Sequence, residues 1–303
     1  MDLKELIKNP KKIIFSLGMK GKLGFISDEK YLRLMYWANT GKKLNLEKPV
    51  TFNEKLQWLK LHNQNPEYSK MVDKYEAKKW VADRIGEEYI IPTLGVWDSF
   101  DEIDFDQLPN QFVLKCTHDS GGLVVCKDKD KLNKIRAKKK IEASLKRNYF
   151  LVGREYPYKA VKPRIIAEQY MEDATTCVHE AYIDECLTDY KFFCFDGVPR
   201  VLYVGKDKAK DPRTDFFDMD FNHLPIRMRD PNADEIPKRP LEFNEMKNIA
   251  ATLSKGIPHL RVDFYLINGH IYVGELTFYH CSGFAEVHPE EWNHIMGDWI
   301  RIS

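Results

Sequence analysis

One strongly predicted β-hairpin constrains this chain more than any other stretch. Residues 260–283 contain two runs rich in β-branched and aromatic residues, and Asn268-Gly269 lies between them. Asn-Gly in that setting is the strongest short-range signal for a two-residue hairpin turn. A hairpin that closes there places Asp263 and Glu275 nearly opposite each other on one face of the ribbon. Two neighbouring carboxylates repel unless a cation lies between them, and their hard oxygen atoms suit Mg²⁺.

A second interpretation of this hairpin is a solvated polar face on a two-stranded ribbon. Arg261 lies two residues before Asp263, and Thr277 lies two residues after Glu275, so each pair shares a strand face. Both pairs occur in otherwise apolar strands, which favours the metal site. We therefore expect Asp263 and Glu275 to bind metal, with Thr277 beside Glu275 on the same strand face.

Composition excludes several classes of function. The 303 residues are 43% hydrophobic and contain 47 Lys+Arg against 46 Asp+Glu, so net charge gives no argument for nucleic acid as a partner. No apolar run approaches the roughly 18 residues of a membrane span. The six cysteines lack CxxC spacing, which favours reduced thiols over a zinc site. The chain is expected to be cytoplasmic.

Helices and antiparallel hairpins occur in separate blocks, which predicts an α+β fold rather than a doubly wound parallel sheet. Residues 1–64 are predicted to be helical, with Thr51 or Asn53 as the cap of a helix. A long loop is expected over residues 207–240, of the kind that recognises substrate or closes over it. Residues 153–158 form an aromatic loop to which the sequence assigns no purpose.

Candidate phosphate ligands precede the hairpin. Lys115 lies inside an apolar strand, where a cation is costly unless it is paired. The turn Ser120-Gly121-Gly122 can present backbone N–H groups to an anion as a nest. A turn of Ser and Gly is also common without any ligand, so both interpretations stay open.

Three further positions have competing interpretations. Lys74 is either a solvated helix residue or a ligand for the nucleotide. Asp189 and Lys191 share one strand face, so a structural ion pair competes with a binding role. The segment Glu168, Gln169, Tyr170 and Met171 ends a short apolar strand and is either a plain connector or an edge that recognises a base.

Taken in order, these segments resemble the ATP-grasp superfamily, and specifically its TupA-like branch, which is associated with bacterial surface-polysaccharide gene clusters. The similar segments are 49–58, 73–75, 108–118 with 120–121, 163–168, 189–193 and 261–277. No single segment is specific, but six in one order are, and they cover nearly the whole chain. The resemblance implies an ATP-grasp fold, in which two α+β lobes grip ATP between antiparallel sheets, preceded by a helical N-terminal region.

The resemblance also implies roles for the candidate residues. Lys74 and Lys115 would reach ATP, Ser120-Gly121-Gly122 would close over its phosphates, and residues 168–171 would form the adenine and ribose edge. Lys191, with Asp189 beside it, would touch the γ-phosphate. Asp263 and Glu275 would bind Mg²⁺, with Arg261 stabilising the acyl-phosphate step. Many ATP-grasp enzymes carry Asn where this chain has Thr277, which makes a second metal site less secure.

These implications define an ATP- and Mg²⁺-dependent carboxylate–amine ligase. Its substrates would be a small amine and the carboxylate of a uronic acid in a surface polysaccharide or its nucleotide-sugar precursor, and a polysaccharide-assembly partner remains open. The alternatives are a kinase that phosphorylates a sugar or glycan hydroxyl, and a non-catalytic nucleotide- or glycan-binding module. The expected divisions are a helical region 1–64, an N-terminal lobe 65–108, a lid subdomain 109–167 and a metal-bearing subdomain 168–303.

Overall fold

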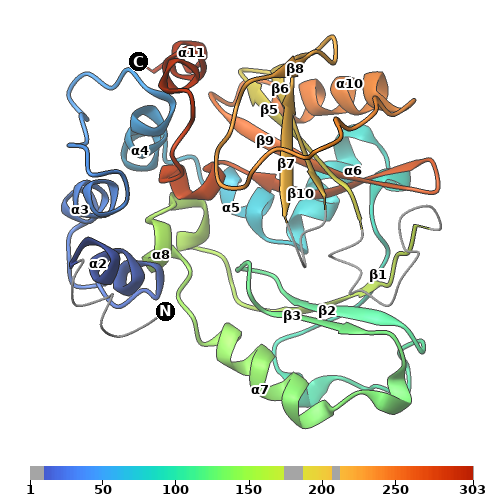
Figure 1. The fold of residues 1–303 in the computed structure, drawn as a ribbon. Coiled ribbons are helices and arrows are strands. Elements are labelled where there is room, and N and C mark those ends of the chain that lie inside the picture. Colours follow the sequence, from blue (N-terminus) through green and yellow to red (C-terminus); the bar gives the residue numbers. More distant parts are fainter. Residues whose placement is uncertain (1–9, 174–186, 207–211, 303) are drawn as a thin grey trace.

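Two antiparallel sheets form the framework of the protein (Figure 1). The computed structural model describes residues 10–173, 187–206 and 212–302. Cys177 and Cys186 lie outside these residues. The smaller sheet has the order β1 (Thr93–Trp97), β4 (Ile165–Gln169), β2 (Phe112–Cys116), β3 (Leu123–Cys126). The larger has the order β10 (His270–Thr277), β9 (Leu260–Ile267), β5 (Asp189–Phe195), β6 (Val198–Lys206), β7 (Arg213–Phe217), β8 (His223–Leu224). The predicted α+β class is confirmed.

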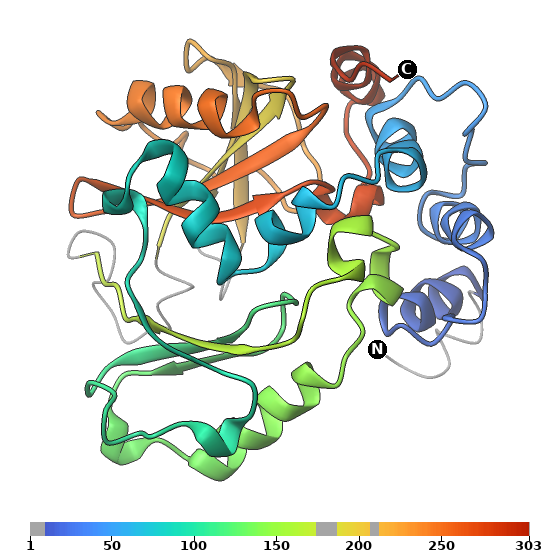
Figure 2. The same ribbon diagram turned by 180° about the vertical axis from the view of Figure 1, so that it is seen from behind.

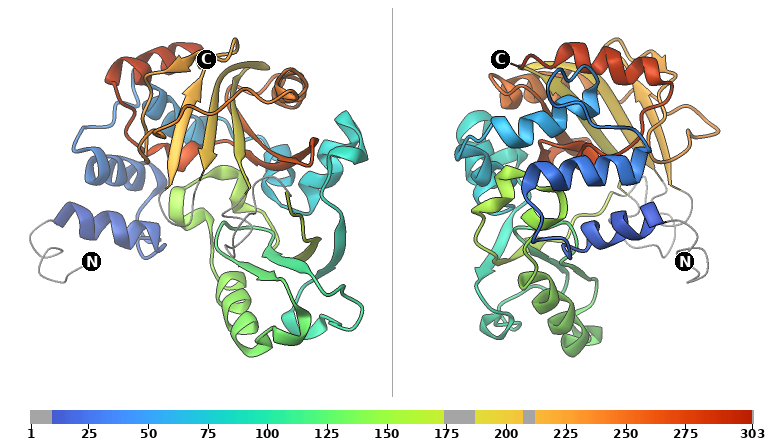
Figure 3. Two further views of the ribbon diagram at one scale, coloured as in Figure 1. Left: turned by 45° about the vertical axis from the view of Figure 1, so that its right-hand side comes forward. Right: turned by 90° about the vertical axis from the view of Figure 1, so that its left-hand side faces the viewer.

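Helices cover one face of each sheet and form a separate layer at the N-terminal side (Figures 2 and 3). Their bounds are α2 (Pro10–Met19), α3 (Asp28–Thr40), α4 (Phe52–His62), α5 (Glu67–Val72), α6 (Glu76–Ile85), α7 (Lys134–Leu145), α8 (Phe150–Gly153), α10 (Phe243–Ser254) and α11 (Glu290–Trp299). The short 3₁₀ turns are η1 (Glu87–Tyr89), η2 (Phe100–Glu102), η3 (Lys129–Lys131), η4 (Tyr156–Lys159) and η5 (His280–Gly283). None of the helices in the described part of the chain has both the length and the apolar character needed to cross a bilayer.

Each sheet has its own apolar core. The larger sheet packs against α10 and α4–α6 through a cluster that includes Phe192, Phe243 and Phe264, all fully buried. The smaller sheet packs against α7 around Phe112 and Ile141. Burial of apolar area is the main favourable term in folding, so each lobe is held by its own core.

The start of α4 confirms one of the predicted caps. The Thr51 hydroxyl accepts a hydrogen bond from the Glu54 amide at 3.3 Å, and the Glu54 carboxylate accepts one from the Thr51 amide at 3.1 Å. This reciprocal capping box satisfies two amides that a helix start would otherwise leave unpaired. Asn53, the other predicted cap, instead donates from its side chain to the Ala285 carbonyl at 2.6 Å.

Helix α4 is tied to η5, more than two hundred residues later. The Gln57 amide donates to the carbonyls of Ser282 and Gly283 at 3.0 and 2.8 Å. Lys60 donates to the Ser282 carbonyl at 2.8 Å. The N-terminal helical layer therefore supports the segment that follows the β9–β10 hairpin.

The prediction of a continuous loop over residues 207–240 is wrong for part of that range. Residues 213–224 contain β7 and β8, which extend the larger sheet. The cause is burial, because Phe216 and Phe217 are almost fully covered by the core. Residues 207–211 lie outside the described residues.

Candidate active site

The predicted hairpin is present, and its register brings the two carboxylates face to face. Asn268 and Gly269 have φ of 51° and 76°, the left-handed pair of a two-residue hairpin turn. A bulge at Gly274 shifts the register by one residue, so that Glu275 lies directly opposite Asp263. A Cβ on Gly274 would lie 2.7 Å from the Tyr265 ring. The bulge therefore favours glycine and aims Glu275 towards the site.

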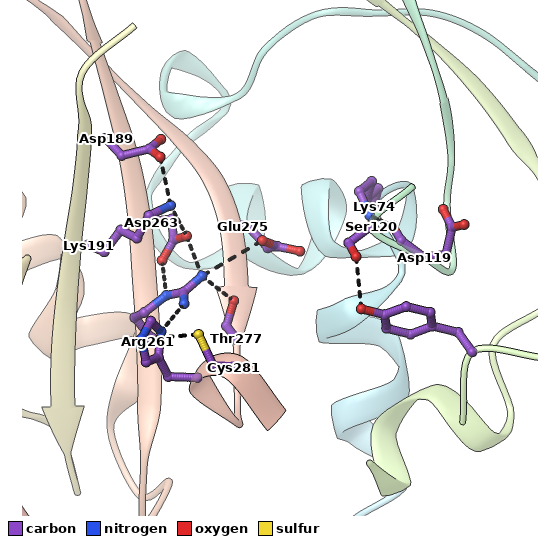
Figure 4. Close-up of polar contacts among 12 residues, drawn as sticks. Lys74, Asp119, Ser120, Asp189, Lys191, Arg261, Asp263, Glu275, Thr277 and Cys281 are labelled. Atoms are coloured by element: carbon purple, nitrogen blue, oxygen red, sulfur yellow. Dashed lines mark hydrogen bonds and ion pairs between the residues drawn. The ribbon is translucent and has the colours of Figure 1, made fainter. Parts of the chain in front are cut away.

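Arg261 lies between these carboxylates (Figure 4). Its guanidinium binds both oxygens of Asp263, each at 2.7 Å, and approaches Glu275 Oε2 at 3.9 Å. It also donates to Thr277 Oγ1 at 3.0 Å. Arg261 is 8% exposed and Asp263 4% exposed. Burial alone would raise the pKa of the Asp263 carboxyl, but Arg261 and Lys191 hold that pKa below its usual value, so Asp263 stays ionised.

Lys191 extends the network on β5, opposite Asp263 in the register. Its ammonium lies 2.8 Å from Asp263 Oδ2 and 3.0 Å from Asp189 Oδ2. The ion pair that competed with a binding role for Asp189 and Lys191 is therefore present. Burial opposes the charge, but Asp263 and Asp189 together raise the pKa of Lys191 above its usual value. These two carboxylates therefore hold the lysine as a cation.

His280 belongs to the same network and was not singled out by the sequence analysis. Arg261 Nη1 donates to His280 Nδ1 at 2.6 Å. Guanidinium groups only donate, so Nδ1 must carry the lone pair and His280 must be neutral. Burial and the nearby Arg261 lower the pKa of His280 well below its usual value, in agreement. A lone histidine after an apolar strand carries no local signal that would have identified this contact.

Lys115 is paired, as its position in an apolar strand requires. Glu168 on the neighbouring strand β4 lies 2.8 Å from the Lys115 ammonium and 2.7 Å from that of Lys78. Burial would raise the pKa of Glu168, but Lys115 and Lys78 lower it to about 2. Lys78, on α6, was missed because a lysine on a charged helix is usually solvated. Both carboxylate oxygens of Glu168 are therefore engaged in ion pairs with these lysines.

The residues that follow Glu168 separate into two environments. Gln169 is exposed, and its amide donates to the Pro92 carbonyl at 3.0 Å. Tyr170 and Met171 pack in a small apolar cluster between the two sheets, with Val113 and Ile267. Such a cluster offers an apolar surface beside the Lys115–Glu168 pair.

The loop between β2 and β3 is organised by Asp119, which the sequence analysis also missed. Its side chain accepts from the Gly122 amide at 3.1 Å and from the Ser144 hydroxyl, and its carbonyl accepts from the Lys74 ammonium. One of the amides predicted for an anion nest is therefore already engaged. Ser120 and Gly121 are exposed at the tip, where Ser120 Oγ lies 2.9 Å from Tyr149 Oη (Figure 4).

A cleft lies between the lysines around Glu168 and the hairpin that carries Glu275. It is lined by Lys74, Lys78, Lys115 and Glu168 on one side and by residues 273–276 on the other. Lys115 of the smaller sheet, together with Lys74 and Lys78 from the α5–α6 region, therefore lies across the cleft from Glu275 of the larger sheet. This arrangement can gather polyanionic groups between the sheets.

Asp263 and Glu275 supply the oxygen ligands that a divalent cation takes, but both oxygens of Asp263 already accept hydrogen bonds from Arg261. Within the described residues, no cluster of three or more His, Cys, Asp or Glu side chains could hold a metal ion. Glu275, whose side chain is 37% exposed, is the more available ligand, because both Asp263 oxygens are engaged by Arg261. A Mg²⁺ bound here would take its remaining oxygen ligands from phosphate groups and water, as this ion usually does.

Two antiparallel sheets that face each other across a cation-lined cleft are the framework of the ATP-grasp fold. The chain belongs to the TupA-like ATP-grasp family, whose model matches residues 54–301. The predicted family and fold are confirmed. No curated protein matches the chain.

Solved structures with a similar arrangement share little sequence with the chain. D-alanine–D-alanine ligase from Bacillus anthracis, complexed with ATP, is 16% identical over 69% of this chain and 54% of that chain, with a TM-score of 0.39. The ATP-grasp ligase PsnB, complexed with a minimal precursor, Mg and ADP, is 13% identical over 74% and 57%, with a TM-score of 0.37. D-cycloserine synthetase DcsG is 17% identical over 76% and 69%, with a TM-score of 0.39. The chain thus spans little more than half the length of the first two, and the family match carries the assignment.

Proposed function

We propose that the protein is an ATP- and Mg²⁺-dependent carboxylate–amine ligase that forms an amide through an acyl phosphate. The observation that carries this proposal is the buried Arg261–Asp263–Lys191 network, which faces Glu275 and the lysine-lined cleft. A carboxylate is a poor electrophile, so amide formation at neutral pH requires its activation by a phosphoryl group. Gathering ATP, a carboxylate and the charge of the transition state needs fixed cations rather than a covalent nucleophile.

The proposed roles come from the family resemblance, and the positions of the side chains around the cleft support them. Lys74 and Lys115 bind the phosphates of ATP, with the Ser120-Gly121-Gly122 loop closing over them. The backbone of residues 168–171 forms the adenine and ribose edge, with Tyr170 and Met171 as its apolar surface. Lys191, held by Asp189, contacts the γ-phosphate.

Mg²⁺, bound by Asp263 and Glu275 with Thr277 beside them, would neutralise phosphate charge during transfer. Arg261 stabilises the acyl-phosphate step. Its guanidinium is already oriented by Asp263, Thr277 and His280, so little reorganisation is needed when charge develops. The loop carrying Ser120 is the proposed lid, which keeps water away from the acyl phosphate. The lid subdomain is proposed to span residues 109–167, between an N-terminal lobe 65–108 and the metal-bearing subdomain 168–303. In the structure, β1 and β4 also pair with each other in the smaller sheet.

The proposed carboxylate substrate is a uronic acid, either in a surface polysaccharide or in its nucleotide-sugar precursor, and the amine is an amino acid or another small amine. Support for the sugar comes from the resemblance to the branch associated with surface-polysaccharide gene clusters. We propose a cytoplasmic location on the same basis, since both ATP and nucleotide sugars occur there.

The test is ATP consumption with UDP-glucuronate and a panel of amines, with products identified by mass. A ligase yields the amide mass and needs the amine, whereas a kinase yields a phosphate mass without it. Asp263→Asn and Glu275→Gln should abolish ATP turnover and leave the fold intact. Full activity in both variants would refute the assigned site, and ATP binding without turnover by the wild type on any substrate would favour a non-catalytic module.

A further inference from the structure

A buried carboxylate lies beside the proposed site and has no role in the chemistry described so far. Glu155 is 7% exposed and belongs to the aromatic loop 153–158. Its Oε1 accepts a hydrogen bond from Ser282 Oγ at 2.5 Å. Ser282 follows Cys281 and His280 on η5, and His280 accepts from Arg261, so Glu155 is linked to the Arg261 network through one short turn.

The second oxygen of Glu155 is available to a ligand. Among the described residues, Oε1 has the Ser282 hydroxyl as its partner, and Oε2 has no hydrogen-bond partner. Tyr158, one turn further along, is half-buried, and its hydroxyl also has no hydrogen-bond partner among the described residues. The Tyr158 ring packs edge-on against that of Tyr149, at 4.8 Å between centroids, and Tyr149 contacts Ser120 in the proposed lid.

The neighbouring buried cation does not occupy that oxygen. Lys60 is 2% exposed and donates to Gln57 Oε1, the Gly153 carbonyl and the Ser282 carbonyl at 2.9, 2.7 and 2.8 Å. These three contacts use all the protons of an ammonium group. Lys60 therefore contributes positive potential near Glu155 without a direct ion pair. Burial raises the pKa of Glu155 above its usual value, which reflects an anion that lacks sufficient partners.

We propose that Glu155, with Tyr158 and Ser282, binds the amine substrate as its ammonium ion. The inference rests on the proposed ligase function and names the site of its second substrate. The lysine-lined part of the cleft is cationic and suits the phosphates of ATP, whereas an ammonium needs an accessible anion and neutral acceptors. Glu155 Oε2 provides the anion and Tyr158 Oη a neutral acceptor, and both groups are close enough to Arg261 and Glu275 to feel their charges.

The site also provides a path for the protons of the reaction. One ammonium proton passes to Glu155, and the nitrogen lone pair then attacks the acyl-phosphate carbon. The C–N bond forms, and the bond between the carbonyl carbon and the phosphate oxygen breaks. Inorganic phosphate leaves with the electrons of that bond and takes the second proton from the nitrogen. Burial raises the pKa of the Glu155 carboxyl, which makes it a better acceptor for the first proton than a solvated carboxylate.

Glu155→Gln tests the inference because it keeps the shape and the Ser282 contact but removes the charge. The assay uses Mg²⁺, ATP, UDP-glucuronate and the best amine of the panel, glycine, L-glutamate or ethanolamine. We expect the KM for the amine to rise roughly ten- to hundredfold, the factor that corresponds to one lost hydrogen bond to a charged group. The KM for ATP should stay unchanged. Glu286→Gln is the matched control, because Glu286 is exposed and follows η5, which carries Ser282. It should leave the KM for the amine unchanged.

A trapping reaction separates this inference from the ligase proposal. Concentrated hydroxylamine captures an acyl phosphate as a hydroxamate without needing an amine site. The wild type and Glu155→Gln should form hydroxamate equally. An unchanged amine KM in the variant, a parallel loss of ATP binding, or a wild type that forms hydroxamate but uses no amine of the panel would each overturn the amine site. Absence of hydroxamate from the wild type would instead overturn the ligase proposal itself.

Discussion

The carboxylate of Glu168 provides the most quantitative test of the site, because it holds two lysines in place. Its oxygens lie 2.7 Å from Lys78 and 2.8 Å from Lys115. Glu168→Gln preserves the size of the side chain and removes its charge. Two ammonium groups would then face an amide across the cleft without their counterion. We expect this variant to lose stability and to keep its secondary structure.

The magnitude follows from the pKa of Glu168, which the lysines lower from 4.5 to about 2 despite burial. Each unit corresponds to about 1.4 kcal/mol, so the shift is worth about 3 kcal/mol in the free energy of unfolding. Burial lowers the pKa of Lys78 even beside Glu168, which reduces the net gain. The lysine side chains are also 16% and 21% exposed, which lets water screen them in the variant. The expected loss at pH 7 is roughly 2–3 kcal/mol, below the usual cost of breaking a fully buried pair.

The pH dependence identifies the cause. The folded-state pKa of Glu168 lies below the unfolded value, so its contribution is complete above pH 4.5 and is lost as the pH falls towards 2. Urea unfolding of wild type and variant between pH 7 and pH 2.5 should therefore show a difference that shrinks on acidification. Glu172→Gln, at an exposed position, should stay within about 0.5 kcal/mol of wild type. A difference that is absent at pH 7, or constant with pH, would refute the reasoning.

Three further changes test other contacts. Gly269→Ala, at a φ of 76°, should lower the free energy of unfolding by about 1 kcal/mol in thermal melts, and an unchanged melt would contradict the hairpin turn. Burial lowers the pKa of Lys60 from 10.5 to about 7, so the folded state releases its proton first and wild-type stability rises between those pH values. Lys60→Met should lack this rise in denaturant titrations, and an equal rise in both proteins would contradict the burial of the charge. Arg261→Lys keeps the charge but loses the bidentate contact with Asp263. The rate of ADP formation at saturating substrate should therefore fall roughly hundredfold. Near-normal turnover would remove Arg261 from the reaction.

The hairpin was predictable because its signals are local. Asn268-Gly269 fixes the turn, and strand periodicity then places Asp263 near Glu275. The bulge at Gly274 was not predicted, although a glycine inside a strand is a recognised sign of one. Lys115 was predicted to need a partner, and Glu168 supplies it. Here sequence reasoning succeeded because a cation in an apolar strand needs an anionic partner, wherever in the sequence that partner lies.

The contacts that sequence reasoning missed join residues far apart in the chain. Asp119 acts through Lys74 and Ser144, Lys78 through Glu168, and His280 through Arg261. Each is an ordinary polar residue in its own neighbourhood. Ile135 on α7 is 84% exposed although it is apolar, because the smaller sheet covers only one face of this helix. Tertiary packing decided all of these.

The attachment of α4 to η5 has a consequence for how the protein is made. Gln57 binds the Gly283 carbonyl across 226 residues of sequence, and Lys60 binds Ser282 across 222. Contacts of such large separation form late, since the loop between them must close first. The ribosome must therefore synthesise the strands that carry Asp263 and Glu275 before η5, which lies next to Arg261, can bind α4. Nascent chains would contain Lys74 and Lys115 long before Asp263 and Glu275 are synthesised, so the proposed centre would stay incomplete during most of synthesis.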